Sequence, residues 1–164
     1  MKGPDHEWLR TVANRAARAP GCPFCSERRV SATNSLAALR PDLAQQWHPA
    51  KNGSVTPHDV TRRHARPAGR RVWWKCPKGP DHEWHAWPWA RAIGGQGCPF
   101  CAGQRFSATN SLATRRPDLA RGWHPTKNGG LTPRDLSYGS KTLVWWRCPK
   151  EPDHEWRAAP KVRR

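Results

Sequence analysis

The sequence predicts a small, metal-stabilised α+β fold made of tandem modules, in which short β-hairpins alternate with short helical linkers. Three observations lead to this prediction: the chain repeats itself, Cys and His residues recur at fixed spacings within the repeat, and the apolar content is low. Of the 164 residues, 36% are hydrophobic, against about 45–50% in a typical domain. Because such a chain buries little apolar surface, we expect bound metal to supply part of its folding free energy.

An internal repeat organises the chain. Residues 3–60 align without gaps on residues 79–136, at an offset of 76. A third, partial copy begins at Val144, where Val-Trp-Trp-Arg-Cys-Pro-Lys matches Val-Trp-Trp-Lys-Cys-Pro-Lys at 72–78. The basic stretch at 61–69, rich in Arg, Pro and Gly, is predicted to form a loop. A repeat of this kind indicates that one structural unit recurs along the chain.

The linker segments 31–60 and 107–136 begin like helices. Asn34 or Ser35 can cap a first turn, and Pro41 suits the first position of a second short helix. Leu36, Leu43 and Trp47 then fall on one face of a helical path, and the second copy repeats this spacing. We therefore expect two short helices in each linker.

The metal-binding segments are predicted to form strands. Residues 72–74 and 144–146 are β-branched and aromatic, which favours a strand in each copy. We expect a second strand to run from Trp84 through Trp87 and Trp89. The predicted modules are a partial metal module at 1–30, a helical linker with the basic loop at 31–71, a complete metal module at 72–106, a second helical linker at 107–143 and a partial metal module at 144–164.

The central module carries a complete set of metal ligands, Cys76, His82, Cys98 and Cys101. Five residues separate the first two ligands, fifteen the next two and two the last two. Two close pairs about fifteen residues apart are typical of two knuckles that hold one tetrahedral zinc ion. Three thiolates and one imidazole complete the coordination, so the predicted role is structural. The alternative is a redox-active pair at Cys98 and Cys101.

Two further ligand sets are incomplete. The N-terminal set is His6, Cys22 and Cys25, and the C-terminal set is Cys148 and His154. Cys148 with His154 and Cys22 with Cys25 are complementary halves of the four-ligand pattern. One hypothesis is that these halves meet and displace His6, either within one chain or head-to-tail between chains. The alternative is that the N-terminal trio takes water as its fourth ligand.

The chain has eleven tryptophans, and most of them recur in the repeat. The tryptophan two residues after each ligand histidine is present in all three copies, so we expect it to pack beside the metal. Trp87 and Trp89 are different, because Thr11 and Ala13 stand at the matching positions of the first copy. These two tryptophans are therefore candidates for a contact surface.

A resemblance to a known family rests on several motifs: Trp-x-Cys, His-Glu-Trp and Cys-Pro-Phe-Cys, joined by Asn-Ser-Leu-Ala, Pro-Asp-Leu-Ala, Trp-His-Pro and Lys-Asn-Gly. The sequence resembles tandem copies of the family called "probable zinc-ribbon domain", a treble-clef-like module. The resemblance covers nearly the whole chain and implies tandem zinc-ribbon or treble-clef modules. Such modules are sometimes found beside very-short-patch-repair-like endonuclease domains, which implies a role on DNA.

The formal net charge of +17 favours polyanionic partners. Arginine binds phosphate in a bidentate manner and stacks on bases, so we predict nucleic-acid binding. The family resemblance implies DNA rather than RNA. The predicted binding residues are the basic cluster in and after the insertion, two arginines of the second linker and the two unrepeated tryptophans: Arg62, Arg63, Arg66, Arg70, Arg71, Lys75, Arg115, Arg116, Trp87 and Trp89.

The sequence has no run of ~18 apolar residues and no apolar stretch of signal-peptide type at its start. We therefore expect a soluble cytoplasmic protein, with the nucleoid as one location. In that compartment the six cysteines are expected to bind metal rather than form disulfides.

Two other functions stay open at the level of sequence. A protein-interaction adaptor is one, because zinc ribbons often serve as docking modules and exposed Trp87 and Trp89 would suit an interface. A metal-finger nuclease is the other, because His48 and Asn52 are similar to its His and Asn, and His124 and Asn128 repeat them. The second histidine and the metal-binding acid of such a nuclease are not found, so we predict a protein that is not an enzyme.

Overall fold

The computed structural model describes residues 3–13, 21–63 and 71–163. The chain divides into two compact units. Unit 1 consists of Met1–Cys76 with Glu83–Gln96, and unit 2 of Pro77–His82 with Gly97–Arg164. Each unit contains short helices and one antiparallel hairpin, which confirms the predicted small α+β fold.

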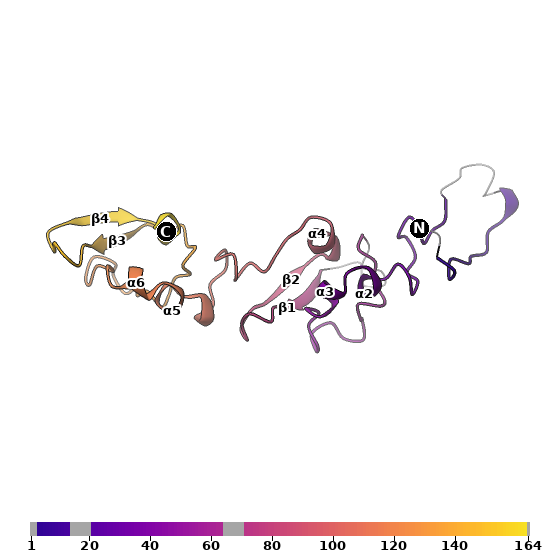
Figure 1. Ribbon diagram of the computed structural model, residues 1–164, viewed down its shortest axis with the longest axis horizontal. Helices are drawn as coiled ribbons and strands as arrows, with labels where there is room; N and C mark the ends of the chain where they lie inside the picture. The colour runs from indigo at the N-terminus through magenta and orange to yellow at the C-terminus, as the bar shows by residue number, and fades with distance from the viewer. Residues whose placement is uncertain (1–2, 14–20, 64–70, 164) are drawn as a thin grey trace. The chain divides into compact units, whose positions relative to one another are not determined.

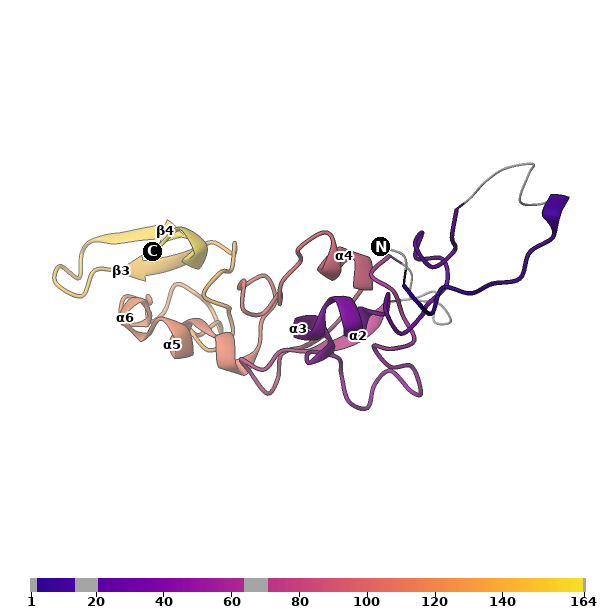
Figure 2. The ribbon, with the colours of Figure 1, turned by 45° about the vertical axis from the view of Figure 1, so that its right-hand side comes forward.

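Unit 1 contains α2 (Leu36–Leu39), α3 (Pro41–Ala44), β1 (Val72–Lys75), β2 (Glu83–Ala86) and α4 (Pro88–Ala92). Unit 2 contains η1 (Ala108–Asn110), α5 (Leu112–Arg115), α6 (Pro117–Ala120), β3 (Val144–Arg147), β4 (Glu155–Ala158) and η2 (Pro160–Val162). Within unit 1, Figures 1 and 2 both show α2 and α3 beside the hairpin β1–β2, and α5 and α6 have the same place beside β3–β4 in unit 2.

The helix starts follow from the sequence. Ser35 caps α2, because its side chain accepts a hydrogen bond from the Ala38 N–H. A proline then begins α3 and α6 at the first helical position, as predicted, since a proline there needs no N–H donor. Of the two capping candidates, Asn34 serves elsewhere: its amide donates to the carbonyls of Phe24 and Arg29.

Each hairpin buries one tryptophan of its Trp-Trp pair. Trp74 is fully buried and pairs with Trp84 across β1 and β2, and Trp146 pairs in the same way with Trp156 across β3 and β4. The segment that follows α3 packs against the edge of β1, where Trp47 forms an antiparallel β-bridge with Trp74. Side chains alternate across a strand, so the neighbouring Trp73 lies on the opposite face.

The predicted strand through Trp87 and Trp89 is wrong. β2 ends at Ala86, Trp87 is the N-cap of α4, and Pro88 starts that helix. Proline lacks the N–H that a strand ladder needs but fits the first turn of a helix, so the chain changes direction there. Trp89 lies on α4 with 49% of its surface exposed.

An arginine packs against the paired tryptophans in both units. The Arg91 guanidinium carbon lies 4.4 Å from the ring centre of Trp74 and 4.9 Å from that of Trp84. In unit 2 the Arg163 guanidinium carbon lies 4.3 Å from Trp146 and 4.9 Å from Trp156. Cation–π contact therefore stabilises both cores. Within the described residues, no helix is long and apolar enough to span a membrane.

Candidate metal centres

Four side chains form the larger metal-ligand cluster. The ligand atoms of Cys76, His82, Cys98 and Cys101 all lie within 4.8 Å of one another. His82 Nδ1 is 3.8 Å from Cys98 Sγ and 3.6 Å from Cys101 Sγ. Around a tetrahedral zinc ion, with Zn–S of about 2.3 Å and Zn–N of about 2.0–2.1 Å, such atoms lie about 3.5–3.6 Å apart. The donor set and its spacing therefore fit a tetrahedral metal ion.

The hydrogen bonds behind His82 fix which ring nitrogen faces the cluster. His82 Nε2 lies 3.1 Å from Thr109 Oγ1, and that hydroxyl donates to Asp81. Because the threonine proton goes to the carboxylate, the hydroxyl oxygen accepts from Nε2–H, and Nδ1 keeps its lone pair for a metal. Burial raises the pKa of Asp81, but the hydrogen bonds from Thr109 outweigh this effect and lower it. Glycine is required at position 79, because a Cβ there would lie only 2.9 Å from the imidazole ring of His82.

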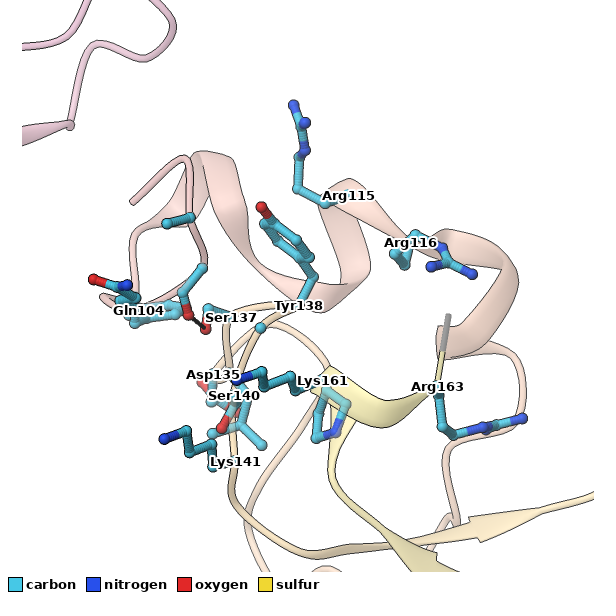
Figure 3. A pocket seen from close by; sticks show the side chains of 16 residues that line it. Gln104, Arg115, Arg116, Asp135, Ser137, Tyr138, Ser140, Lys141, Lys161 and Arg163 are labelled. Carbon is cyan, nitrogen blue, oxygen red and sulfur yellow. Dashed lines mark hydrogen bonds between the residues drawn. The ribbon is translucent and has the colours of Figure 1, made fainter. Parts of the chain in front are cut away.

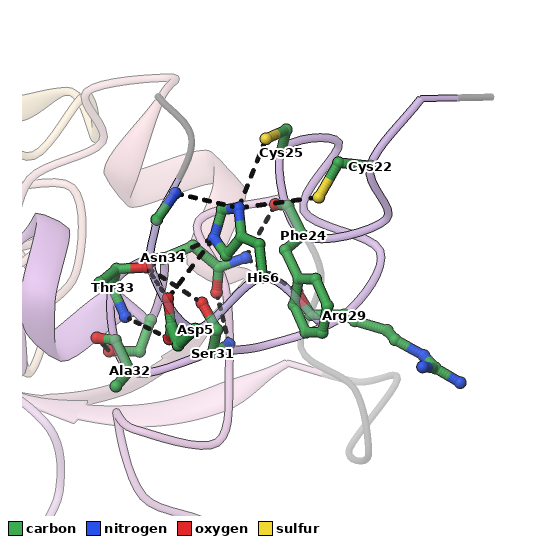
Figure 4. Close-up of polar contacts among 12 residues, drawn as sticks. Asp5, His6, Cys22, Phe24, Cys25, Arg29, Ser31, Ala32, Thr33 and Asn34 are labelled. Carbon is green, nitrogen blue, oxygen red and sulfur yellow. Dashed lines mark hydrogen bonds and ion pairs between the residues drawn. The ribbon is translucent and has the colours of Figure 1, made fainter. Parts of the chain in front are cut away.

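The second cluster repeats this arrangement with three ligands, His6, Cys22 and Cys25. His6 Nδ1 lies 3.6 Å from Cys22 Sγ and 3.5 Å from Cys25 Sγ. Behind the ring, Thr33 Oγ1 lies 3.3 Å from His6 Nε2 and donates to Asp5 at 2.6 Å, as Figure 4 shows. The Thr33 hydroxyl is the main cause that lowers the pKa of Asp5 to about 2.

Both Cys-Pro-Phe-Cys knuckles are held by the same internal contacts. The phenylalanine stacks on the ligand histidine, with ring centres 5.1 Å apart for Phe24 on His6 and also for Phe100 on His82. In the larger cluster the Cys101 N–H points at Cys98 Sγ at 3.5 Å, which is the N–H···S contact that a two-residue spacer permits. The asparagine of each Ser-Ala-Thr-Asn motif connects the knuckle to the following linker, because its amide donates a hydrogen bond to the carbonyl of the knuckle phenylalanine.

The family described as "Probable Treble clef zinc finger domain" matches residues 43–104 and 119–164. The chain belongs to this family. Among curated proteins, none matches the sequence. The two matched segments agree with the tandem repeat. The first contains the whole four-ligand cluster and the second contains Cys148 and His154, whereas the three-ligand cluster lies before both segments.

The third set of predicted ligands in this treble-clef chain, Cys148 and His154, stands apart. Within the described residues these two side chains do not join a cluster of three or more ligands. They lie in the turn between β3 and β4, where the Cys148 N–H donates to the His154 carbonyl. Their pairing with Cys22 and Cys25, within or between chains and with His6 displaced, stays a prediction.

The nuclease-like residues have structural partners. His48 Nδ1 accepts the N–H groups of Ala50 and Lys51, both at 3.1 Å, so its proton is on Nε2, which lies 3.2 Å from Glu83 Oε1. The geometry is better in unit 2, where His124 Nε2 donates to Glu155 Oε1 at 2.6 Å. The Lys51 ammonium is the main cause that lowers the pKa of Glu83 to about 2.

Asn52 is also occupied by the fold. Its Oδ1 accepts the Trp73 N–H at 2.8 Å, and its amide donates to the Trp73 carbonyl at 3.0 Å. Asn128 holds Trp145 in the same way, at 2.7 and 2.9 Å. The His-Pro-x-Lys-Asn-Gly segment is therefore a clasp on the outer edge of each hairpin.

The predicted nucleic-acid-binding residues of unit 1 are in several environments. Arg62 is paired with the buried carboxylate of Glu27, whereas Arg63 and Arg71 are exposed. Lys75 Nζ lies 3.6 Å from Glu83 Oε1. Arg66 and Arg70 lie outside the described residues. The pairing with Glu27 comes from a residue 35 positions earlier, so local sequence gave no sign of it.

In unit 2, Arg115 is exposed at the end of α5, and Arg116 is bonded to Asp118. Trp87 and Trp89 both belong to unit 1, at the start of α4. Trp87 is half-buried and Trp89 is exposed. Among the described residues, the predicted binding residues of unit 1 thus have different surroundings, whereas Arg115 and Arg116 of unit 2 line one hollow.

Proposed function

We propose that this protein is a non-catalytic, zinc-stabilised repeat protein that binds nucleic acid, DNA in preference to RNA, through its arginine-rich surface. The zinc assignment rests on the donor set, because thiolates and imidazole in tetrahedral spacing suit zinc. Zinc would be held by Cys76, His82, Cys98 and Cys101, and would link the two knuckles without an open coordination position.

One observation carries the nucleic-acid assignment: most acids of this chain are bonded to its own side chains, while many of its cations face solvent. Nine of the twelve acidic residues accept hydrogen bonds or ion pairs from other side chains of the chain: Asp5, Glu27, Asp42, Asp59, Asp81, Glu83, Asp118, Asp135 and Glu155. The chain therefore carries its net charge of +17 with most of its carboxylates already bonded to its own side chains. The positive electrostatic potential of such a surface attracts phosphate backbones.

The occupied state of His124, Asn52 and Asn128 supports the non-catalytic part of the proposal. Both ring nitrogens of His124 already have partners, and both polar atoms of Asn128 hold the backbone of Trp145. A general base needs a ring nitrogen within reach of substrate. These residues serve the hairpin instead.

Salt dependence tests the proposal. The zinc-loaded protein is titrated into a fluorescein-labelled duplex DNA of mixed sequence between 50 and 200 mM NaCl, and anisotropy gives the affinity. We expect the logarithm of affinity to fall linearly with the logarithm of salt, with a slope of about 0.9 per phosphate contact. A single-stranded RNA of equal length gives the comparison. Absence of binding at 50 mM would refute the nucleic-acid assignment.

The second candidate function is a protein-interaction adaptor, and α4 favours it. Trp89 is 49% exposed and Ile93 is 54% exposed, so an aromatic and an aliphatic side chain face solvent on neighbouring turns. Such residues are enriched at interfaces. Binding to a protein partner that persists at high salt and is lost in Trp89→Ala would support the adaptor.

A further inference from the structure

Unit 2 contains a hollow of about 950 Å³ whose lining is strongly cationic. Among the lining residues that the structure describes, five are basic and one, Asp135, is acidic. The basic residues come from three segments of the unit and surround the hollow in Figure 3: Arg115, Arg116, Lys141, Lys161 and Arg163. The Asp135 carboxylate already accepts two hydrogen bonds from Thr132, so it offsets little of this charge.

Three of the cations are available to a ligand. Arg115, Lys141 and Lys161 are exposed, whereas Arg116 is bonded to Asp118 and Arg163 packs on two tryptophans. Burial, followed by the charge of Arg116, lowers the pKa of Arg163. Positive charges therefore repel one another here, and an anion in the hollow would relieve that repulsion.

The matching place in unit 1 has different chemistry. Glu27 has a backbone φ of 59° and Gly103 has 69°, and each carbonyl accepts the hydroxyl of the residue that follows the long linker, Thr61 or Ser137. The two positions are therefore equivalent. In unit 1 the buried Glu27 carboxylate binds Arg62, whereas in unit 2 the acid is replaced by Gly103.

The other matched positions place the cations differently in the two units. Arg115 stands where unit 1 has Leu39, and Lys161 stands where it has Trp89. Tyr138 replaces Arg62, and its ring lies 5.9 Å from the Arg115 guanidinium carbon. Unit 2 thus lacks the buried acid of unit 1, and its cations at Arg115 and Lys161 stand where unit 1 has uncharged side chains.

We infer that the hollow of unit 2 is the place where the phosphodiester backbone of a nucleic acid docks, with Arg115, Lys141 and Lys161 as the phosphate contacts. This inference rests on the proposed nucleic-acid-binding function and assigns it to one site. Lysine and arginine side chains from separate segments can neutralise successive phosphates along a strand. Tyr138 supplies a flat wall on which the guanidinium of Arg115 is held in place.

A triple substitution tests the site. Arg115→Leu, Lys141→Ala and Lys161→Ala are combined in the full-length, zinc-loaded protein, and its binding to the labelled duplex is measured between 50 and 200 mM NaCl. We expect an affinity at least about tenfold lower and a salt slope smaller by up to about three, at 0.9 per lost contact. Unchanged zinc content and melting temperature show that the variant is folded.

The matched control removes the same charge from unit 2 outside the hollow. Arg105, Arg121 and Arg134 are exposed and do not line it, so Arg105→Ala, Arg121→Ala and Arg134→Ala are combined. We expect this control to keep most of the affinity and slope. If the two triple variants weaken binding equally, the hollow is no special site although the proposed function stands. If the unsubstituted protein does not bind DNA, both the docking site and the proposed function are refuted.

A single isosteric change gives a sharper test. Gln104 lines the hollow, and Gln104→Glu places a negative charge there with little change of shape. Gln45 is exposed at the end of α3, so Gln45→Glu makes the same charge change in unit 1. We expect Gln104→Glu to weaken DNA binding several-fold and Gln45→Glu to change it less than twofold. Equal effects of the two substitutions would overturn the inference.

Discussion

Unit 1 and unit 2 use the same Trp–Arg–Trp stack, but they enclose it to different degrees. Arg91 is 4% exposed and also bonds to Gln46 and to the Gln96 carbonyl. Arg163 is half-buried, and its partner Trp156 is half-buried too. The five-residue helix α4 covers the first stack, whereas the three-residue η2 covers the second. The stack itself is thus the repeated element, and among the described residues it is more fully enclosed in unit 1 than in unit 2.

The metal clusters differ in a parallel way. Four ligands meet in the cluster of Cys98, and three meet in that of Cys25, yet the His–Thr–Asp chain and the histidine–phenylalanine stack are the same in both. The surroundings of a site can therefore be complete where the described ligand set is not. The predictions below separate the contribution of the ligands from that of the surroundings.

The largest expected effect is the loss of a ligand from the four-ligand cluster. Cys98→Ser should release about one zinc per chain and unfold the surrounding residues, because the binding free energy of structural zinc is also folding free energy. Cys25→Ser is the matched change at the three-ligand cluster, and its melting temperature should fall much less. Zinc content by mass spectrometry and thermal unfolding give the answer. A Cys98→Ser protein with normal zinc content and melting temperature contradicts the structural role of the site.

The next effect concerns the two arginine stacks. Arg91→Ala should lower the free energy of unfolding by about 3 kcal/mol, because it removes a desolvated cation–π contact and leaves a cavity. Arg163→Ala should cost about 1 kcal/mol, since its stack is open to water. Denaturant unfolding followed by tryptophan fluorescence measures both. Equal losses would show that enclosure does not set the strength of the stack.

The smallest effect is expected behind the ligand histidine. Thr109→Val removes the hydroxyl that links His82 to Asp81, and this should weaken zinc binding about 10–100-fold in competition with a chelator. Thr109→Ser keeps the hydroxyl and should restore the affinity. Thr33→Val makes the same change at the three-ligand cluster. If Thr109→Val binds zinc as tightly as the unsubstituted protein, the tautomer is fixed in some other way.

Much of the fold could be predicted because its signals are local. Cys and His spacing identified the ligands of both clusters, and Pro41 marked the start of a helix. The strand through Trp89 was wrong because aromatic content was given more weight than Pro88, whose ring favours a helix start. Arg91 was not predicted as a core residue, although its match to Arg163 at the same offset as Cys76 and Cys148 was a usable signal.

The contacts that escaped prediction are long-range. Thr109 and Asp81 are 28 residues apart, and Arg62 and Glu27 are 35 apart. Composition and spacing do not reveal which of many cations pairs with a distant acid. Arg62 was therefore assigned to a nucleic-acid surface, whereas the structure uses it to neutralise a buried carboxylate.

The asparagine clasp has a consequence for how this chain avoids errors during folding. β1 and β3 are nearly identical in sequence, Val-Trp-Trp-Lys and Val-Trp-Trp-Arg, so either could pair with the wrong neighbour, in the same chain or in another. The open edge of β1 is occupied by backbone bonds from residues 46–48 and by the Asn52 amide, and that of β3 by the equivalent bonds and Asn128. A strand edge occupied in this way offers no template to a second copy of itself. The clasp thus protects a tandem repeat from exchanging strands between its own copies.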